Sequence, residues 1–141
     1  MKFWDASAVI PLLLAEPQRA ALLGELERDP VMLVWWGTPV ECVSGIARRE
    51  REGALGAEQA RAAIERLRSL SLSWQEVLPT DAVRATAQRL LRVHALRAAD
   101  SLQLAAAVLV AERDPATLPL VSLDERLCDA AAREGFQIVR A

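Results

Sequence analysis

The sequence predicts an α/β fold with a mostly parallel sheet and helices on both faces of that sheet. Short apolar segments rich in β-forming residues alternate along the chain with longer segments of helical spacing, as expected for parallel strands joined by crossover helices. The run at residues 31–36 is apolar throughout and bounded by turn residues, which is typical of a strand covered on both faces. At 141 residues the chain is long enough for one core, so we expect a single domain over residues 1–141.

The first half of the chain is expected to begin on a strand and to contain three further breaks. Glu16-Pro17 separates two helices, Asp29-Pro30 ends the second, and Gly37 follows the apolar strand. Thr38-Pro39-Val40-Glu41 has the pattern of a capping box, with Thr38 as the cap. The expected elements are a strand at 1–4, helices at 6–14 and 18–28, a strand at 31–36 and a helix at 38–52.

The second half alternates in the same way. An amphipathic helix is followed by a segment with the alternation of an edge strand, and the segment after Asp100 is apolar enough to be a central buried helix. Gly135 is expected to end the last helix. The expected elements are a helix at 56–70, an edge strand within 71–77, helices at 79–93 and 98–111, a strand at 118–123, a helix at 124–133 and a strand at 136–139.

Composition narrows the possible functions. The net charge of −2 gives no general attraction to nucleic acid, so any such contact needs a local patch. Cys42 and Cys128 have no C-x-x-C or histidine companion, which predicts buried thiols rather than a zinc site or a disulfide. No apolar stretch has the length of a membrane span and no secretory signal is visible, so we expect a soluble cytoplasmic protein without membrane contact.

Four carboxylates stand at comparable places in the predicted fold. Asp5 follows the first strand, Glu41 lies in the first turn after the second, Asp100 opens the buried helix, and Asp124 follows the strand near residue 121. Ligand sites in open α/β sheets form beyond the carboxyl ends of the strands, so these acids can converge. Clustered carboxylates repel one another unless a cation fills the site, and oxygen ligands favour Mg²⁺ or Mn²⁺.

Each acid also has a purely structural explanation. Asp5 can cap the following helix with help from Ser7, Glu41 can complete the capping box, and Asp124 can be a first-turn acid beside Ser122. Asp100 is harder to explain in this way, because its segment is so apolar that an uncompensated carboxylate would be costly.

The ordered motifs resemble the PIN-domain ribonucleases, at the length of a stand-alone VapC-type toxin. Trp4-Asp5-Ala6-Ser7 resembles their D-x-S opening, Thr38-Pro39-Val40-Glu41 their glutamate after strand two, residues 96–105 the segment with their third acid, and Val121-Ser122-Leu123-Asp124 their V-T-x-D. The resemblance implies a single PIN-like domain with a five-stranded parallel sheet, Mg²⁺-dependent cleavage of RNA, a homodimer, and neutralisation by a cognate antitoxin.

The resemblance also assigns roles to individual residues. Asp5, Asp100 and Asp124 would hold one or two Mg²⁺ ions, with Glu41 as a direct ligand or acting through water. Ser7 would orient a carboxylate or water, and Ser122 stands in place of the more usual threonine. Arg97 can hold RNA phosphate or pair with one of the acids. Many relatives have histidine where this chain has Gln103, and Glu125 and Asp129 remain outside the core set of acids.

The acids are also compatible with two other functions, a phosphoacceptor domain and a non-catalytic module. A phosphoacceptor signalling domain would need a lysine after its fifth strand, and the sole lysine, Lys2, lies at the wrong end; a non-catalytic module would use the acids only as caps. His94 is expected to cap a helix or face solvent rather than act as a base.

Apolar stripes on the helices at 56–70 and 79–93 favour a dimer. An antitoxin peptide is expected to place an arginine or lysine among the acids and to pack near Leu13, Leu22 and Val43.

Overall fold

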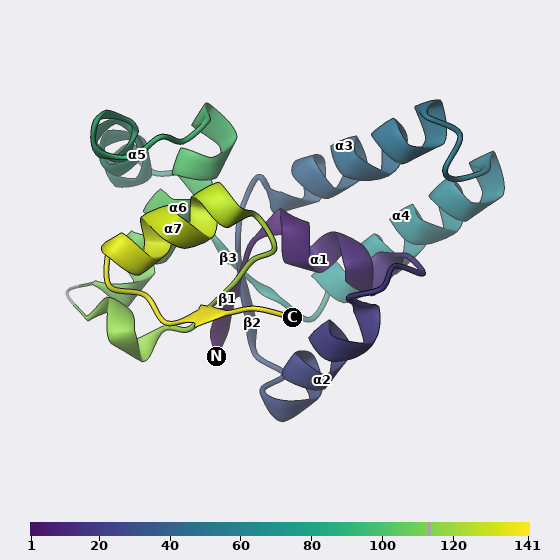
Figure 1. The fold of residues 1–141 in the computed structure, drawn as a ribbon, viewed down its shortest axis with the longest axis horizontal. Coiled ribbons are helices and arrows are strands. Elements are labelled where there is room, and N and C mark those ends of the chain that lie inside the picture. Colours follow the sequence, from purple (N-terminus) through teal and green to yellow (C-terminus); the bar gives the residue numbers. More distant parts are fainter. Residues whose placement is uncertain (113) are drawn as a thin grey trace.

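The computed structural model describes residues 1–112 and 114–141, in which strands and helices alternate as predicted (Figure 1). The strands are β1 (Lys2–Trp4), β2 (Met32–Trp35), β3 (Gln75–Val77), β4 (Leu120–Val121) and β5 (Ile138–Val139). The helices are α1 (Ala6–Leu13), α2 (Arg19–Arg28), α3 (Thr38–Arg51), α4 (Ala57–Ser71), α5 (Asp81–Val93), α6 (Ala98–Ala111) and α7 (Glu125–Arg133), with a 3-10 turn at Pro115–Thr117.

The sheet has the strand order β3-β2-β1-β4-β5, and every pairing among the described strands is parallel. Phe3 of β1 lies between Leu33 of β2 and Leu120 of β4, so β1 is the central strand. The chain builds outward from β1 on one side through β2 and β3, then returns to build β4 and β5 on the other. The carboxyl end of β1 is therefore the switch point at which open α/β sheets place their ligand sites.

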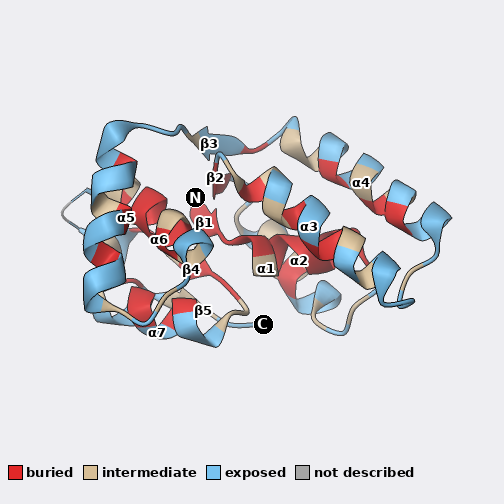
Figure 2. Cartoon of the chain, turned by 90° about the horizontal axis from the view of Figure 1, so that it is seen from above, coloured by how far each residue is buried: buried red, intermediate tan, exposed pale blue. Residues whose placement is uncertain are grey.

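Two hydrophobic cores cover the two faces of the sheet, because successive strand residues point to opposite sides. Trp4, Met32 and Val34 pack with α1 to α4, whereas Phe3 and Leu33 pack with α5 to α7. Figure 1 shows the same division, and the central strands are buried in Figure 2. The prediction of helices on both faces is confirmed.

The predicted capping box at Thr38 is wrong. The N-cap of α3 is Gly37, and no side chain within the described chain caps the helix. Thr38 is fully buried instead, and its Oγ1 accepts a hydrogen bond from Gln103 Nε2 at 3.2 Å. The hydroxyl therefore serves a contact with α6, 65 residues away, which the local pattern could not indicate.

Several helix faces expected to be open are covered. Most of the apolar residues on the stripes of α4 and α5 pack into the two cores, which leaves Leu91 of the predicted stripe on α5 exposed. Leu13 and Leu22 are buried in the core with α1 to α4 and cannot line a peptide groove, whereas Val43 is exposed. Cys42 and Cys128 are free and buried, as expected, and burial raises the pKa of both thiols.

No single helix in the described chain is long and apolar enough to cross a membrane. Taken together, α5 and α6 have the length and the apolar composition of a membrane span, but the two helices are bent by 118° at their junction. The apolar composition of α6 has another explanation, since Leu104 to Ala107 are fully buried in the protein core.

Close packing holds α3 against α1. A Cβ at Gly45 of α3 would lie 2.6 Å from Cδ1 of Ile10 in α1, so glycine allows these helices their close approach. Asp5 lies immediately before α1 and Glu41 in the first turn of α3. The contact at Gly45 therefore helps to hold the segments that carry these two acids next to each other.

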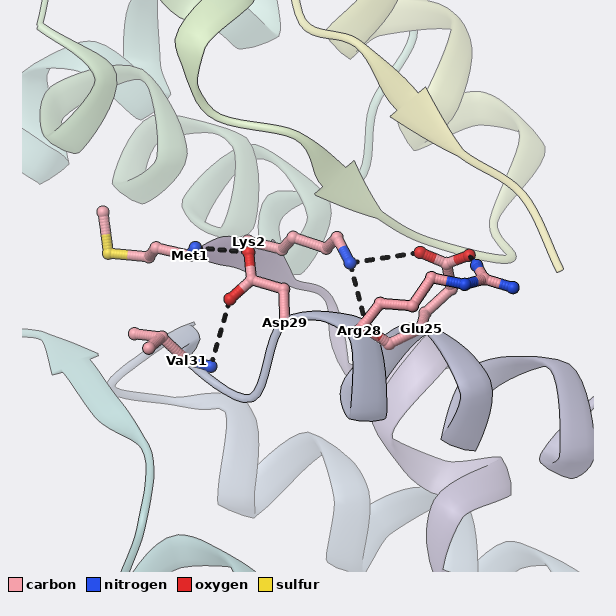
Figure 3. A network of polar contacts seen from close by, with 6 residues as sticks. All are labelled: Met1, Lys2, Glu25, Arg28, Asp29 and Val31. Carbon is pink, nitrogen blue, oxygen red and sulfur yellow. Dashed lines mark hydrogen bonds and ion pairs between the residues drawn. The ribbon is translucent and has the colours of Figure 1, made fainter.

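The amino end of the sheet has its own polar network (Figure 3). Lys2 Nζ donates to the carbonyl of Glu25 at 3.0 Å and to Glu25 Oε2 at 3.1 Å. Arg28 pairs with the other oxygen of Glu25, and the N-terminal amine pairs with Asp29. These contacts fasten the start of β1 to the end of α2. Lys2 is engaged at the end of the sheet opposite to the acids and cannot serve a phosphoacceptor site.

Candidate active site

The four predicted acids line one cleft at the carboxyl ends of the strands. Its volume is about 440 Å³, and Asp5, Glu41, Asp100 and Asp124 all contribute to its wall. They come from four segments: the ends of β1 and β4, the start of α3 and the first turn of α6. Ser7, Arg48 and Arg97 also line the cleft.

Asp5 is the most buried of the four acids, with 3% of its surface exposed. Its Oδ2 accepts hydrogen bonds from the backbone N–H of Ser7 at 3.2 Å, from Ser122 Oγ at 2.9 Å and from Ser7 Oγ. Burial raises the pKa of this carboxyl, against the opposing effect of the serine hydrogen bonds. Asp5 therefore does cap α1, as the structural explanation proposed, while also facing the cleft.

Ser7 and Ser122 join the segments that carry Asp5 and Asp124. Ser7 Oγ accepts from the backbone N–H of Leu123 at 2.9 Å, and Ser122 Oγ accepts from that of Asp124 at 3.1 Å. The two hydroxyl oxygens lie 3.2 Å apart. Each serine thus donates to Asp5 and accepts from the loop after β4, which fixes the spacing of the two acids.

Glu41 is held by Gln103, a residue that the sequence singled out only as a departure from relatives. Gln103 Nε2 donates to Glu41 Oε1 at 3.0 Å as well as to Thr38, and Gln103 is fully buried. The pKa of Glu41 is raised to about 7, first by burial and then by the charge of Asp5. The buried Oε1 of Gln103 has no hydrogen-bond partner among the described residues.

Asp100 lies in the first turn of α6, and Asp124 lies at the amino end of α7. The pKa of Asp100 is raised by burial and by the charge of Asp124, more than the nearby Arg97 and Arg126 lower it. Asp124 caps α7, with its Oδ1 accepting from the backbone N–H of Leu127 at 2.8 Å. Asp124 is thus both a helix cap and a wall of the cleft.

The hydrogen bonds leave part of each carboxylate available. They use Oδ2 of Asp5, Oε1 of Glu41 and Oδ1 of Asp124, and no group in the described chain donates to the second oxygen of these three acids. In residues 1–112 and 114–141, however, no three acidic, histidine or cysteine side chains lie close enough to hold one ion together. Mg²⁺ usually keeps several waters and takes only one or two carboxylates directly, so this wide arrangement of oxygens still fits it.

Of the other residues that the sequence singled out, Arg97 lines the cleft, whereas His94, Glu125 and Asp129 do not. His94 is the C-cap residue of α5, as one of the two expectations had it, and its backbone N–H donates to the carbonyl of Leu90 at 2.9 Å. Its side chain does not face solvent: it is 6% exposed, and its Nε2 lies 2.8 Å from Oε1 of Glu134. Glu125 and Asp129 are exposed and do not line the cleft, and Asp129 lies 3.9 Å from Arg140. Arg97 lines the cleft but, within the part of the chain that the structure describes, forms no ion pair with any acid.

Sequence reasoning missed two residues of the site: Arg48, which lines the cleft, and Gln103, which is fully buried and donates to Glu41. Gln103 lies one turn after Asp100, and its polarity within an otherwise apolar helix was the available signal. Arg48 carried no signal, because several arginines crowd the end of α3 and only the fold shows which of them reaches the cleft.

The comparisons with known proteins agree with this architecture. The family model for the PIN domain matches residues 2–133. A comparison with curated protein sequences found no significant match. Similar solved structures include FitAcB from Neisseria gonorrhoeae, with 17% identity over 98% of this chain and 96% of that one and a TM-score of 0.67.

Two further structures have the same TM-score of 0.67. VapC20 of Mycobacterium tuberculosis, a toxin that cleaves the sarcin-ricin loop, is 20% identical over 100% of both chains. FitAB bound to the IR36 DNA fragment is 16% identical over 99% of this chain and 94% of that one. These likenesses show a shared fold, and the family match extends over nearly the whole sequence. The chain belongs to the PIN domain family.

Proposed function

We propose that this protein is a metal-dependent endoribonuclease and the toxin of a toxin–antitoxin pair. The observation that carries the proposal is the cleft itself, where carboxylates from four separate segments converge at the switch point of the sheet. Membership of the PIN domain family and the fold shared with VapC20, an RNA-cleaving toxin, support the same function.

The metal ligands would be Asp5, Asp100 and Asp124, with Glu41 binding directly or through a water. Mg²⁺ or Mn²⁺ bound there would activate water and stabilise the charge that develops on the phosphodiester. Ser7 and Ser122 hold Oδ2 of Asp5 and leave Oδ1 for the cation. Gln103 holds Oε1 of Glu41, so that Oε2 can accept a hydrogen bond from the attacking water.

The main rival is a non-catalytic module whose acids are only caps. Asp5 and Asp124 do cap helices, but neither role accounts for Glu41, which caps nothing, or for Asp100. Raised pKa values at Asp5, Glu41 and Asp100 indicate that bringing these carboxylates together is unfavourable for their ionised forms. A purely structural role gives no reason for that arrangement.

A cleavage assay tests the proposal. Purified protein should cut structured RNA with Mg²⁺ or Mn²⁺ and stop in EDTA, and Asp100→Asn should lose the activity. Arg61→Ala, which removes an exposed charge on α4, is the control for the general effect of a substitution and should retain the activity. If wild type and Asp100→Asn cut equally, the activity belongs to a contaminant and the proposal fails.

A small antitoxin is the proposed partner, and FitAB-like structures together with the VapC-type resemblance support it. An arginine or lysine of the antitoxin would take the cation's place and pair with Asp5, Asp100 and Asp124. Its apolar residues would pack near the exposed Val43 on α3 rather than at Leu13 and Leu22. Co-expression with the product of the adjacent open reading frame should yield a complex that cuts no RNA.

The homodimer and the cytoplasmic location are also proposals. Exposed apolar side chains that a second copy can cover include Trp36 and Leu78, which lie near each other because the N–H of Trp36 donates to the carbonyl of Val77. Light scattering at micromolar concentration should give twice the chain mass of 15.4 kDa. A strict monomer would contradict the dimer.

A further inference from the structure

The acidic cleft has an electrostatic difficulty as an RNA site. A phosphodiester strand is negatively charged and would be repelled by Asp5, Glu41, Asp100 and Asp124. A cation at the centre relieves this repulsion for the scissile phosphate only. The neighbouring phosphates need positive groups of their own, at the edges of the cleft.

Two arginines line the cleft from opposite faces of the sheet. Arg48 belongs to α3, which packs on the face with α1, α2 and α4. Arg97 immediately precedes α6, which packs on the face with α5 and α7. Figure 1 shows α3 and α6 on the two sides of the strands. Each side of the acidic cleft therefore contributes one arginine.

Neither arginine is used in a protein ion pair. Within residues 1–112 and 114–141, no carboxylate oxygen lies within 4 Å of the guanidinium of Arg48 or Arg97, although four carboxylates line the same cleft. Other arginines do pair. Nε of Arg49, next to Arg48, lies 2.6 Å from Oε1 of Glu16, and Nη1 of Arg68 lies 2.7 Å from Oε1 of Glu65 on its own helix. The two arginines of the cleft thus remain available to an incoming anion.

We propose that Arg48 and Arg97 form an arginine pair that holds the RNA phosphates on either side of the scissile one. The strand would cross the cleft from α3 to the turn between α5 and α6, with one phosphate at each guanidinium and the scissile phosphate over the acids. Arginine suits this task because its planar group donates two parallel hydrogen bonds to a phosphate. The inference rests on the proposed function and adds the path of the substrate to it.

Binding to an inactive protein tests the arginine pair separately from catalysis. In an Asp100→Asn background, fluorescence anisotropy with a labelled single-stranded RNA should show about tenfold weaker binding after Arg48→Ala or Arg97→Ala. Each change should also reduce the slope of log Kd against log salt concentration by about 0.7, as expected for one lost phosphate contact on a single strand. Arg48→Lys should recover part of the affinity, because it keeps the charge.

The matched control is Arg68→Ala. It removes the same charge from an exposed position on α4, a helix from which no described residue lines the cleft. Its effect on binding should stay below about twofold. Equal losses for Arg48→Ala, Arg97→Ala and Arg68→Ala would mean that only net charge matters, and would overturn the proposal.

Neutral linkages locate each contact along the strand. A methylphosphonate placed next to the scissile phosphate on one side should weaken binding to the parent protein but should have no further effect in one of the two alanine variants. A methylphosphonate on the other side should do the same for the other variant. If both variants respond to the same side, or to neither, the strand does not take the proposed path.

The outcomes separate this inference from the proposed function. If RNA binds through the arginine pair but is not cut by the wild type, the arginine pair is supported and the nuclease function is contradicted. If Arg48→Ala and Arg97→Ala cut RNA with an unchanged KM, the nuclease function is supported and the arginine pair is contradicted. A protein that binds no RNA would overturn both.

Discussion

Charged side chains of the described residues are paired at one end of the parallel sheet and unpaired at the other. At the amino end the charged groups drawn in Figure 3 are paired: Lys2 and Arg28 pair with Glu25, and the N-terminal amine pairs with Asp29. At the carboxyl end four carboxylates share a cleft, and within the described chain no arginine pairs with them. The pKa of Asp29 is lowered by the N-terminal amine, whereas that of Glu41 is raised.

The difference shows which end is built for stability. At the amino end the pairing favours the ionised form of Asp29, and the contacts of Lys2 fasten β1 to α2. Unpaired acids at the carboxyl end destabilise the folded protein when they are ionised, since burial and mutual repulsion both oppose their charges. A cost of that kind is expected where a cation and a substrate complete the site.

The largest predicted effect is at Asp100. Asp100→Asn should lower RNA cleavage at least 100-fold, since removing even a group that only orients a metal ligand costs about 10–100-fold. The same change should leave the melting temperature without metal unchanged or higher, because it relieves repulsion with Asp124. Cleavage rates and melting curves with and without Mg²⁺ measure both effects.

Asp29→Asn is the matched change at the amino end, with the same loss of charge. It should lower the melting temperature slightly and leave cleavage unchanged, because Asp29 pairs with the N-terminal amine and lies away from the cleft. The comparison breaks if Mg²⁺ raises the melting temperature of the wild type and of Asp100→Asn equally, because the ion then binds elsewhere.

The next effect concerns Lys2, whose side chain is 11% exposed. Lys2→Met should lower the free energy of unfolding by about 2 kcal/mol, because it removes two hydrogen bonds and leaves Glu25 with Arg28 alone. Urea unfolding measures the loss, and cleavage should not change. Arg28→Met removes the more exposed partner of the same acid and should cost less than about 0.5 kcal/mol. Equal losses in the two variants would contradict a special role for the buried lysine.

A smaller effect at the carboxyl end should separate positioning from stability. Gln103→Met should reduce cleavage about tenfold, because Glu41 loses the donor that holds its Oε1. The free energy of unfolding should fall by only about 1 kcal/mol, because Thr38 and Glu41 lose their donor, while the similar volume of methionine and the removal of the unpartnered buried Oε1 offset part of that loss. A large loss of stability with normal cleavage would make Gln103 a structural residue only.

Most of the fold could be predicted because its signals are local. Apolar runs, Pro and Gly breaks and helical spacing located the strands and helices to within a few residues, and the order of the acids along the chain indicated the cleft. Gln103 could not be predicted as a partner of Thr38 and Glu41, because that contact joins segments more than 60 residues apart. The same limit hid Arg48, and it made Thr38 look like a cap when its hydroxyl faces another helix.

The smallest effect is a pH dependence with opposite signs at the two ends. The pKa of Glu41 is about 7 in the folded protein and 4.5 in an unperturbed glutamate. The folded chain thus binds more protons than the unfolded chain in this window, and the free energy of unfolding falls as pH rises from 4.5 to 7. Asp29, with its lowered pKa, instead stabilises the folded protein above pH 3.8 and loses that contribution in acid.

Melting in EDTA tests the sign at Glu41. The wild type should melt about 4 °C lower at pH 8 than at pH 5, which corresponds to about 1 kcal/mol for a partly exposed carboxyl. Glu41→Gln should lose part of this difference, Asp29→Asn should keep it, and saturating Mg²⁺ should reduce it because a cation favours the ionised acids. A wild type that melts higher at pH 8 than at pH 5 would mean that the acids of the cleft are already compensated. The contrast between the two ends of the sheet would then no longer hold.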